Sequence, residues 1–292
     1  MNNNGKGYKA FTVFNYIFMC LIILVMLYPM LYVVLASFST SSELIKHMGP
    51  LLYPLKPTGA SYQMVFKNPM IFTGYVNTII IVVSGVLLNM TMTALTAYVL
   101  SRKKLALRKF FTLFIVITMY FGGGMVPVYL TVKQLGLDNS LLALIIPTAM
   151  SAYNMIIMRT AIQSIPESLI ESACIDGAKQ IQVLVKIVLP LVMPTIAVLI
   201  LYYAVGHWNS WFNAMLYLRD RAKFPLQLVL REILITNDTN LMSGDTAAQD
   251  SHAIAETVQY AVIVVATLPI LAIYPFLQKY FVKGVMVGAV KE

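Results

Sequence analysis

The chain has 292 residues, of which 59% are hydrophobic and 11% are charged, and its formal net charge is +9. A soluble globular domain has about 25% charged residues. This composition excludes an ordinary soluble enzyme, a disordered chain and a disulfide scaffold, and it indicates a protein embedded in lipid. The two cysteines, Cys20 in an apolar run and Cys174 in a polar loop, are not expected to pair.

Six apolar segments are long enough to cross a membrane, since a spanning helix needs roughly 20 mostly apolar residues. The first is too long for the apolar region of a signal peptide, and no small-residue cleavage site follows it. We therefore expect an all-α polytopic membrane protein with six transmembrane helices. The predicted spans are residues 11–38, 73–100, 110–130, 141–162, 189–218 and 257–282.

Basic residues of such a protein are expected to collect on the cytoplasmic side. With the N-terminus inside, the inner segments hold 13 basic and four acidic residues, a net of +9, whereas the outer segments hold eight of each. The whole excess of positive charge then falls on one face, and nucleic-acid binding explains it poorly. We expect both the N-terminus and the C-terminus to be cytoplasmic.

The sequence lacks the motifs that would give the chain its own energy source or chemistry. It has no G-x-x-x-x-G-K-[ST] phosphate loop and no H-E-x-x-H zinc motif,. No pair of acidic residues lies inside a predicted span, which argues against coupling to ions. We expect no enzyme activity, no metal and no other cofactor in this chain, so energy for uphill transport would come from another subunit.

The long inner loop after the fourth span has a helix–glycine–helix pattern. Ser164 and Glu167, with Pro166 between them, predict a capped helix start,, and Gly177 suits the end of that helix. A second short helix is expected over residues 178–188. The element would lie along the membrane plane, either facing a partner or resting in the headgroup layer. Its apolar stripe consists of Ile165, Leu169, Ile170, Ala173 and Cys174,.

This loop resembles the EAA loop of type I ABC importer permeases. The motif's spacing is matched by Glu171-Ser172-Ala173, by Gly177 and by Ile187-x-Leu189-Pro190, with Ser172 in place of the middle alanine. Four more segments are similar to the carbohydrate (maltose-permease-like) group, and within it to the LplC-type and complex-polysaccharide branch. They are residues 121–130, 203–214, 225–234 and 274–291.

The resemblance implies a permease subunit of an ATP-driven importer that moves an oligosaccharide or glycan fragment across the bacterial cytoplasmic membrane by alternating access. It implies a homologous second permease, two ATP-binding subunits that carry ATP-Mg, and an extracytoplasmic sugar-binding protein. The EAA loop would dock in a cleft of an ATP-binding subunit. Glu171 and Asp176 would make polar contacts there, and Ala173 and Gly177 would keep the helix thin enough to enter.

Polar and aromatic residues within the spans are candidates for the translocation path, because lipid-facing positions do not tolerate polar groups. Tyr202, Gly206, Asn209 and Asn213 recur at steps of three or four residues and would share one face of a helix,. Aromatic rings suit the C–H faces of a sugar, and amides suit its hydroxyls. The alternative is hydrogen bonding between helices together with an interfacial aromatic belt. The candidates are Tyr202, Asn209, Trp211, Asn213, Tyr120 and Asn154, with His207, Ser210, Asn89 and Asn77 nearby.

The same reasoning divides the chain into three parts. We expect the first span and an outer loop over residues 1–72, a permease core over 73–283 with its coupling loop at 164–190, and a cytoplasmic tail over 284–292. The outer loop 219–256 either reaches toward the binding protein or is a surface loop. Alternative functions are an ABC permease for a non-sugar solute and a stand-alone secondary sugar transporter.

Overall fold

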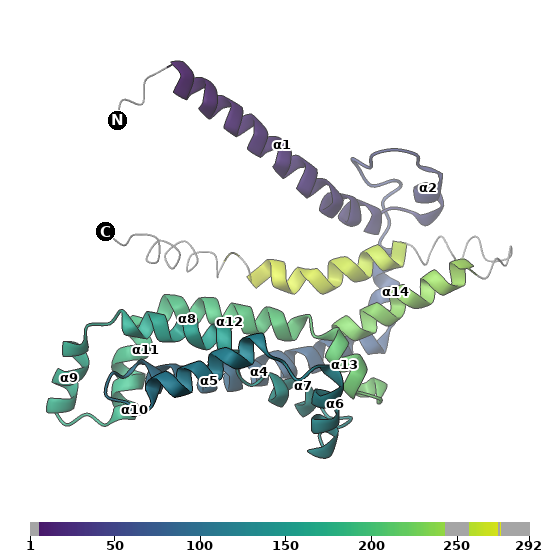
Figure 1. Ribbon diagram of the computed structural model, residues 1–292. Coiled ribbons are helices and arrows are strands. Elements are labelled where there is room, and N and C mark those ends of the chain that lie inside the picture. The colour runs from purple at the N-terminus through teal and green to yellow at the C-terminus, as the bar shows by residue number, and fades with distance from the viewer. Residues whose placement is uncertain (1–5, 243–256, 274, 276–292) are drawn as a thin grey trace. The chain divides into compact units, whose positions relative to one another are not determined.

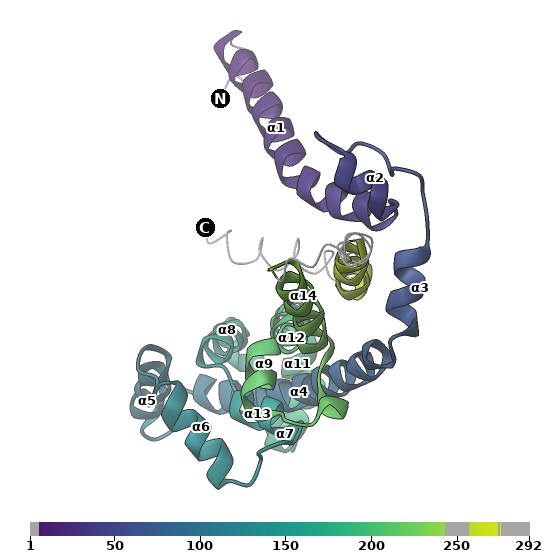
Figure 2. The same cartoon turned by 90° about the vertical axis from the view of Figure 1, so that its right-hand side faces the viewer.

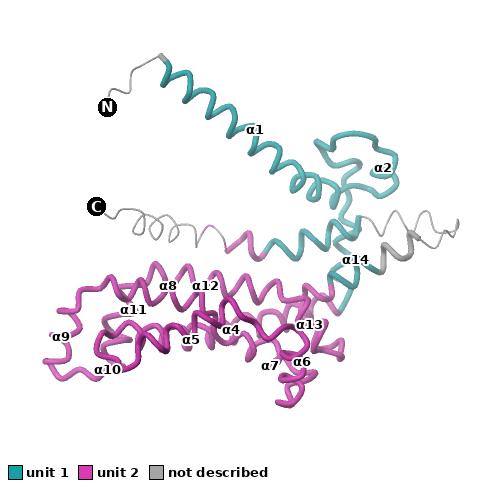
Figure 3. The backbone as a smooth tube through the Cα atoms, in the orientation of Figure 1, with its two compact units in different colours: residues 1–69, 230–268 teal, residues 70–229, 269–292 magenta. Residues whose placement is uncertain are grey.

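The computed structural model describes residues 6–242, 257–273 and 275, and every regular element among them is helical (Figure 1). The chain divides into two compact units (Figure 3). Unit 1 comprises residues 1–69 and 230–268, and unit 2 comprises residues 70–229 and 269–292. The predicted all-α architecture is therefore confirmed for the part of the chain that the structure describes.

Unit 1 begins with one long apolar helix, α1 (Lys6–Ser37). The short helices α2 (Ser41–Lys46) and α3 (Ala60–Lys67) follow it, and a later apolar helix covers Thr257–Ile273. α1 exposes most of its large apolar side chains. A helix that is apolar on all sides suits a lipid environment, as expected for the first span.

The C-terminal end of α1 is held in a small apolar core. Ala36, Leu44 and Leu51 are buried together there. Tyr32 packs edge-on against Tyr260, with ring centroids 5.8 Å apart. The first span and the start of the outer loop are thereby tied to the helix Thr257–Ile273.

Unit 2 contains the second long apolar helix, α4 (Pro69–Ser101), and a series of shorter helices. These are α5 (Arg108–Tyr120), α6 (Met125–Gln134), α7 (Leu142–Ile145), η1 (Ile146–Thr148), α8 (Ala152–Gln163), α9 (Glu167–Ile175), α10 (Gln180–Val183), η2 (Leu184–Val188), α11 (Leu189–Leu191), α12 (Met193–Trp208), α13 (Trp211–Tyr217), η3 (Arg221–Lys223) and α14 (Leu226–Met242), which continues into unit 1. α8 packs against α5 and α12, and Figure 2 shows α8 and α12 nearly end-on. α9 and α10 lie at one end of unit 2, whereas α6 and α13 lie at the other (Figure 1).

One apolar core runs through the first of these ends. It contains fully buried side chains from α4, α8, α10, η2 and α12, so the inner loop and the spans share a single core. These side chains are Ala97, Met155, Met158, Val183, Val188 and Leu199.

Three of the predicted spans are bent. α5 and α6 meet at 113°, the helices Leu142–Thr148 and Ala152–Gln163 meet at 51°, and the helices Gln180–Leu191 and Met193–Trp208 meet at 87°. Two helices of the described residues are long and apolar enough to cross a membrane alone, and up to five spans result if each bent pair counts as one.

The bends correct the expected bounds of the third and fifth spans. Residues 110–130 are interrupted at Gly122–Gly124, where Gly124 has φ +84°, a conformation that favours glycine. Residues 189–218 are interrupted after α11, where Pro194 opens the next helix, and again at residues 209–210. Proline lacks an N–H and therefore belongs in the first turn of a helix. Of the sixth predicted span, 257–282, residues 274 and 276–282 lie outside the described part.

Candidate functional site

The coupling loop predicted from sequence contains a short helix, α9, that ends in a glycine turn. Gly177 has φ +82°. The Gly177 N–H donates to the Cys174 carbonyl at 3.1 Å, and the Ala178 N–H donates to the Ala173 carbonyl at 3.0 Å. These two bonds define a Schellman motif, in which a residue of positive φ satisfies the last carbonyls of a helix. The predicted helix end at Gly177 is confirmed, and a side chain at this position would strain the turn.

The start of α9 differs from the expectation. Ser164 does not cap this helix: it ends α8, and its hydroxyl donates to the Ala161 carbonyl at 2.7 Å. Pro166 is the residue before α9, and Glu167 occupies its first turn. A carboxylate in the first turn favours a helix through the helix dipole. The predicted capping box is therefore wrong, because Ser164 completes the preceding helix.

The four residues of the coupling prediction do not all face outward. Glu171, Asp176 and Gly177 are exposed. Ala173 is half-buried and packs with the buried Ile170 against the core of unit 2. The helix therefore has an inner apolar face that fixes it and an outer face that carries Glu171 beside two exposed apolar side chains. These are Leu169, which is 48% exposed and so does not belong to the predicted buried stripe, and Ile175, which is 85% exposed.

Basic residues of the hairpin between α4 and α5 lie beside α9. Lys103 Nζ is 2.8 Å from Glu167 Oε2, and Lys104 Nζ is 3.8 Å from Glu171 Oε1. The hydrogen bond from Lys103 holds the pKa of the Glu167 carboxyl below its ordinary value. Such exposed ion pairs contribute little to stability. The Glu171 carboxylate is thus loosely paired, and exchanging Lys104 for a cation of a partner protein would cost little free energy,.

A cavity of about 430 Å³ lies between α8, α12 and α13 in unit 2. Its wall combines aromatic rings, amides and hydroxyls, and the lining residues carry no Lys, Arg, Asp or Glu. The polar and aromatic lining residues are Thr148, Ser151, Asn154, Tyr202, Tyr203, His207, Ser210 and Asn213. Aromatic and hydroxyl-bonding groups in a concave wall are typical of a site for a small polar ligand.

A buried polar cluster supports the wall of this cavity. Asn89 Nδ2 donates to the Thr148 carbonyl, so its Oδ1 accepts the Nε2 proton of His207 at 2.7 Å. Tyr203 Oη accepts from the Ser151 N–H at 3.2 Å. Thr148 and Ser151 flank the 51° bend before α8, where backbone groups lose their helical partners. Side chains of α4 and α12 therefore satisfy the broken backbone, as an apolar environment requires.

The structure brings together three of the six predicted path residues. Asn154, Tyr202 and Asn213 line the cavity. Asn209 and Trp211 lie at the break between α12 and α13 and do not line the cavity. Tyr120 does not line the cavity either, and it is 72% exposed at the end of α5. The expected common face of residues 202, 206, 209 and 213 is interrupted, because α12 ends at Trp208.

Sequence reasoning missed part of the site. His207 and Tyr203 are buried in the cavity wall. Tyr203 bonds directly to the bend, and His207 bonds to Asn89, which bonds to the bend. The sequence placed His207 only beside the path. A polar residue inside an apolar span was the available signal, but the bend that gives it partners could not be read from periodicity.

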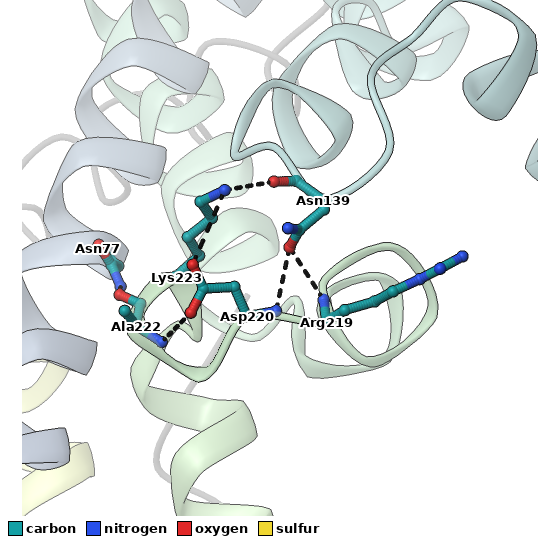
Figure 4. Close-up of polar contacts among 6 residues, drawn as sticks. All are labelled: Asn77, Asn139, Arg219, Asp220, Ala222 and Lys223. Atoms are coloured by element: carbon teal, nitrogen blue, oxygen red, sulfur yellow. Dashed lines mark hydrogen bonds and ion pairs between the residues drawn. The ribbon is translucent and has the colours of Figure 1, made fainter.

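At the opposite end of unit 2, the loop after α13 is fixed by Asn139 and Asn77 (Figure 4). Asn139 Oδ1 accepts the backbone N–H groups of Arg219 and Asp220, each at 3.1 Å. Asn77 Nδ2 donates to the Ala222 carbonyl at 2.8 Å and to the Phe224 carbonyl at 3.1 Å. The start of the predicted outer loop is therefore an ordered connection rather than a surface coil.

The remainder of that predicted loop is also partly ordered. Residues 226–242 form α14, so part of the predicted outer loop 219–256 is helical. Residues 243–256 lie outside the described part of the chain.

The chain matches a family of membrane transport proteins. A family model described as "Binding-protein-dependent transport system inner membrane component" matches residues 94–287, which is more than half of the chain. The chain belongs to this family. It is therefore a multi-pass permease subunit of an ABC transport system in the inner (cytoplasmic) membrane and not an enzyme, since the ATPase of such systems is a separate subunit.

Individual relatives cover the whole chain. The polygalacturonan/rhamnogalacturonan transport system permease protein YtcP of Bacillus subtilis (strain 168) is 41% identical over 97% of this chain and 99% of that protein. Protein LplC of the same organism is 40% identical over 99% of this chain and 97% of that protein.

A solved structure is similar as well. It is a bacterial ABC transporter involved in the import of the acidic polysaccharide alginate, and the match has a TM-score of 0.87, with 30% identity over 96% of this chain and 100% of that one. These relatives confirm the resemblance to the carbohydrate group and its LplC-type branch.

Proposed function

We propose that this permease subunit imports an oligosaccharide or glycan fragment, and that the fragment derives from an acidic polysaccharide. The single observation that carries the substrate class is the agreement between two relatives. YtcP, at 41% identity, is named for polygalacturonan and rhamnogalacturonan, and the solved structure at 30% identity belongs to an importer of alginate. A permease for a non-sugar solute is the alternative.

The membrane topology that fits this function has six spans with both termini in the cytoplasm. Three bent helix pairs, the two long helices and the helix Thr257–Ile273 supply six apolar segments. The concentration of basic residues on one face supports the orientation, and the coupling loop 164–190 would then be cytoplasmic. In this arrangement residues 1–72 form the first span and outer loop, residues 73–283 the permease core, and residues 284–292 the tail.

The α9 end of unit 2 would transmit work from the ATP-binding subunits. Glu171 and Asp176 are exposed there, Ala173 packs inward, and Gly177 leaves open space beside the turn. Two ATP-binding subunits carrying ATP-Mg, a second homologous permease and an extracytoplasmic sugar-binding protein would complete the transporter. This chain would itself hold no cofactor. A near-complete switch between access states needs about 5.5 kcal/mol of differential binding, which a docked helix with a fixed core can transmit.

The uncharged cavity would form this subunit's share of the sugar path. Tyr202 offers a ring face, and Asn154 and Asn213 offer amides to hydroxyls. The lining of this cavity has no Lys or Arg, so the carboxylates of an acidic sugar would be recognised by another subunit. Tyr120, Asn209 and Trp211 remain predictions for other stages of the path.

The test is ATP-driven uptake by the complete complex in liposomes, with a loaded binding protein and a panel of acidic and neutral oligosaccharides. We expect acidic oligosaccharides to stimulate ATP hydrolysis and uptake. Stimulation only by a peptide or another non-sugar solute would overturn the substrate class. Tyr202→Ala should lower uptake about tenfold, a loss of roughly 1.4 kcal/mol that is in the range for aromatic contacts. Tyr153→Ala is the matched control, since Tyr153 lies on α8, is 55% exposed and does not line the cavity. Equal losses in both variants would contradict the assignment of the cavity.

A further inference from the structure

A second pocket, of about 240 Å³, lies between the start of α5 and α8 and is rich in basic residues. Arg108, Lys109 and Arg159 line it together with Thr112 and apolar side chains. Lys109 is exposed, whereas Arg108 and Arg159 are half-buried. Three cations therefore share one small concave site with no acidic residue in its lining.

The site is electrostatically incomplete. Among the described residues, neither Arg108, Lys109 nor Arg159 forms an ion pair within 4.0 Å. The Nε of Arg159 is buried and has no hydrogen-bond partner within the described structure. A buried donor at a charged group is costly to leave unpaired, and like charges around one cavity repel each other. An anion between the two guanidinium groups would offset the repulsion between them.

The surroundings of the pocket point to a lipid as the source of the anion. Leu113 lines the pocket and is 59% exposed, and its neighbours Phe110 and Phe114 are 60% and 61% exposed. These side chains continue along α5 away from its basic start, so a charged group bound at Arg108 and Arg159 would have an apolar helix surface beside it. A phosphate attached to acyl chains fits both parts of the site, and basic pockets between helices at the membrane boundary are known to bind anionic headgroups.

We propose that the pocket formed by Arg108, Lys109 and Arg159 binds the phosphate of an anionic phospholipid whose chains lie along α5. The guanidinium groups of Arg159 and Arg108 donate to the phosphate oxygens, and Lys109 adds a charge at the mouth. The site lies beside the coupling end of unit 2, because Arg108 also lines the pocket that contains Glu167 and Ile170 of α9. A bound lipid would therefore brace the pair α5–α8 next to the element that meets the ATP-binding subunit.

The test measures lipid retained by the purified full transporter complex. The complex is placed in nanodiscs of mixed phosphatidylcholine and phosphatidylglycerol, extracted with mild detergent, and analysed by native mass spectrometry. We expect the wild type to retain phosphatidylglycerol in preference to phosphatidylcholine. Arg159→Gln should reduce this preference about tenfold, since charge-assisted hydrogen bonds are among the strong ones.

Matched variants separate the site from general charge effects. Lys186→Gln removes an exposed cation from the same inner loop, within η2, and should leave the preference unchanged. Arg108→Gln should lower the preference for phosphatidylglycerol. Arg159→Lys keeps the charge and should retain most of the preference; it takes the place of the glutamine variant if that variant fails to assemble. Equal retention in the wild type and R108Q would overturn the proposal, as would equal losses in R159Q and K186Q.

A second arm distinguishes the lipid from a free anion or a protein partner. Complexes in pure phosphatidylcholine are dialysed against labelled inorganic phosphate, and we expect no binding that depends on Arg159. Arg159-dependent phosphate binding without a preference for phosphatidylglycerol would identify a free-anion site instead. A cross-link from a photoreactive residue at position 159 to another protein chain, and not to lipid, would show that a subunit fills the pocket.

Discussion

The two ends of unit 2 are built on opposite principles. At the α9 end, a nine-residue helix exposes the Glu171 carboxylate and is anchored by apolar contacts and a glycine turn. In the cavity between α8 and α12, the polar side chains turn inward and are bonded to one another and to a broken backbone. The first arrangement leaves charged side chains accessible to a partner. In the second, Asn89, His207 and Tyr203 use their hydrogen bonds to stabilise the bend before α8.

The difference teaches where a change of one residue should act. A substitution on α9 alters what the subunit can bind while leaving its fold intact, because the exposed groups contribute little to stability. A substitution in the cavity cluster alters the fold first, because an unpaired polar group within an apolar core costs free energy. Variants in each region, each compared with a matched control, test this distinction.

The largest effect is expected from Gly177→Trp. The side chain would occupy the open space beside the turn at φ +82° and block docking, so uptake should fall to the background of cells that lack the chain. The strain at positive φ should cost only about 1–2 kcal/mol of stability. Retention of the ATP-binding subunits during affinity purification measures docking directly, and we expect it to be lost.

Gly136→Trp is the control for that experiment. Gly136 closes the same kind of turn after α6, with φ +69° and no atoms within 4 Å. Its N–H donates to the Lys133 carbonyl at 3.0 Å, and the Leu137 N–H donates to the Val132 carbonyl at 3.2 Å. The backbone strain is thus equal, but the site is at the other end of unit 2. If G136W also released the ATP-binding subunits, strain and not docking would explain the result.

The next largest effect is expected from Gly85→Ala in α4. An added Cβ would lie 2.4 Å from His207 Nε2, so the ring must move and the bond to Asn89 must break. Overpacking and the lost hydrogen bond each cost about 1–3 kcal/mol. Gly206→Ala is the matched control on α12, where nothing lies within 4 Å, and alanine there should stabilise the helix by about 0.5–1 kcal/mol. Thermal unfolding of the purified complex measures both, and equal shifts would refute the structural role of the cluster.

The same contrast explains what the sequence could predict. The end of helix α9 was readable because Glu171 and Gly177 are local: their spacing fixes one helix and one turn, whatever the rest of the chain does. The helical class and the long spans α1 and α4 followed from composition for a similar reason.

The cavity was only partly readable because its members meet through bends. Periodicity assumed one continuous helix through residues 202–213, and the break after Trp208 removed Asn209 and Trp211 from the wall while leaving Asn213 in it. Asn89 and His207 are 118 residues apart in the chain, and no local rule pairs them. Tertiary contacts decide such sites, whereas local propensity is a weak guide there.

A moderate effect is expected from Asn77→Ala. The buried amide donates to two carbonyls of the connection after α13, Ala222 and Phe224, and its loss leaves both without that donor. We expect a loss of about 1–3 kcal/mol in the free energy of unfolding, measured by denaturation of the purified complex. Asn209→Ala, at an exposed position, should change it by no more than about 0.5 kcal/mol. A larger loss in N209A than in N77A would show that the anchor in Figure 4 does not hold this end of the unit.

The smallest effect is expected from Glu167→Gln at the start of α9. The hydrogen bond from Lys103 lowers the pKa of Glu167 below 4.5, so the pair contributes to stability above that pH and the contribution is lost as the pH falls through the lowered value. Lys103 is 75% exposed and Glu167 is 37% exposed, so the difference in thermal unfolding between wild type and variant should be small. Any difference between them should be confined to neutral and mildly acidic pH and disappear under strongly acidic conditions.

Glu171→Gln should weaken retention of the ATP-binding subunits, whereas Glu167→Gln should not. If E167Q released them as readily as E171Q, Glu171 would not be the specific contact that the partner recognises.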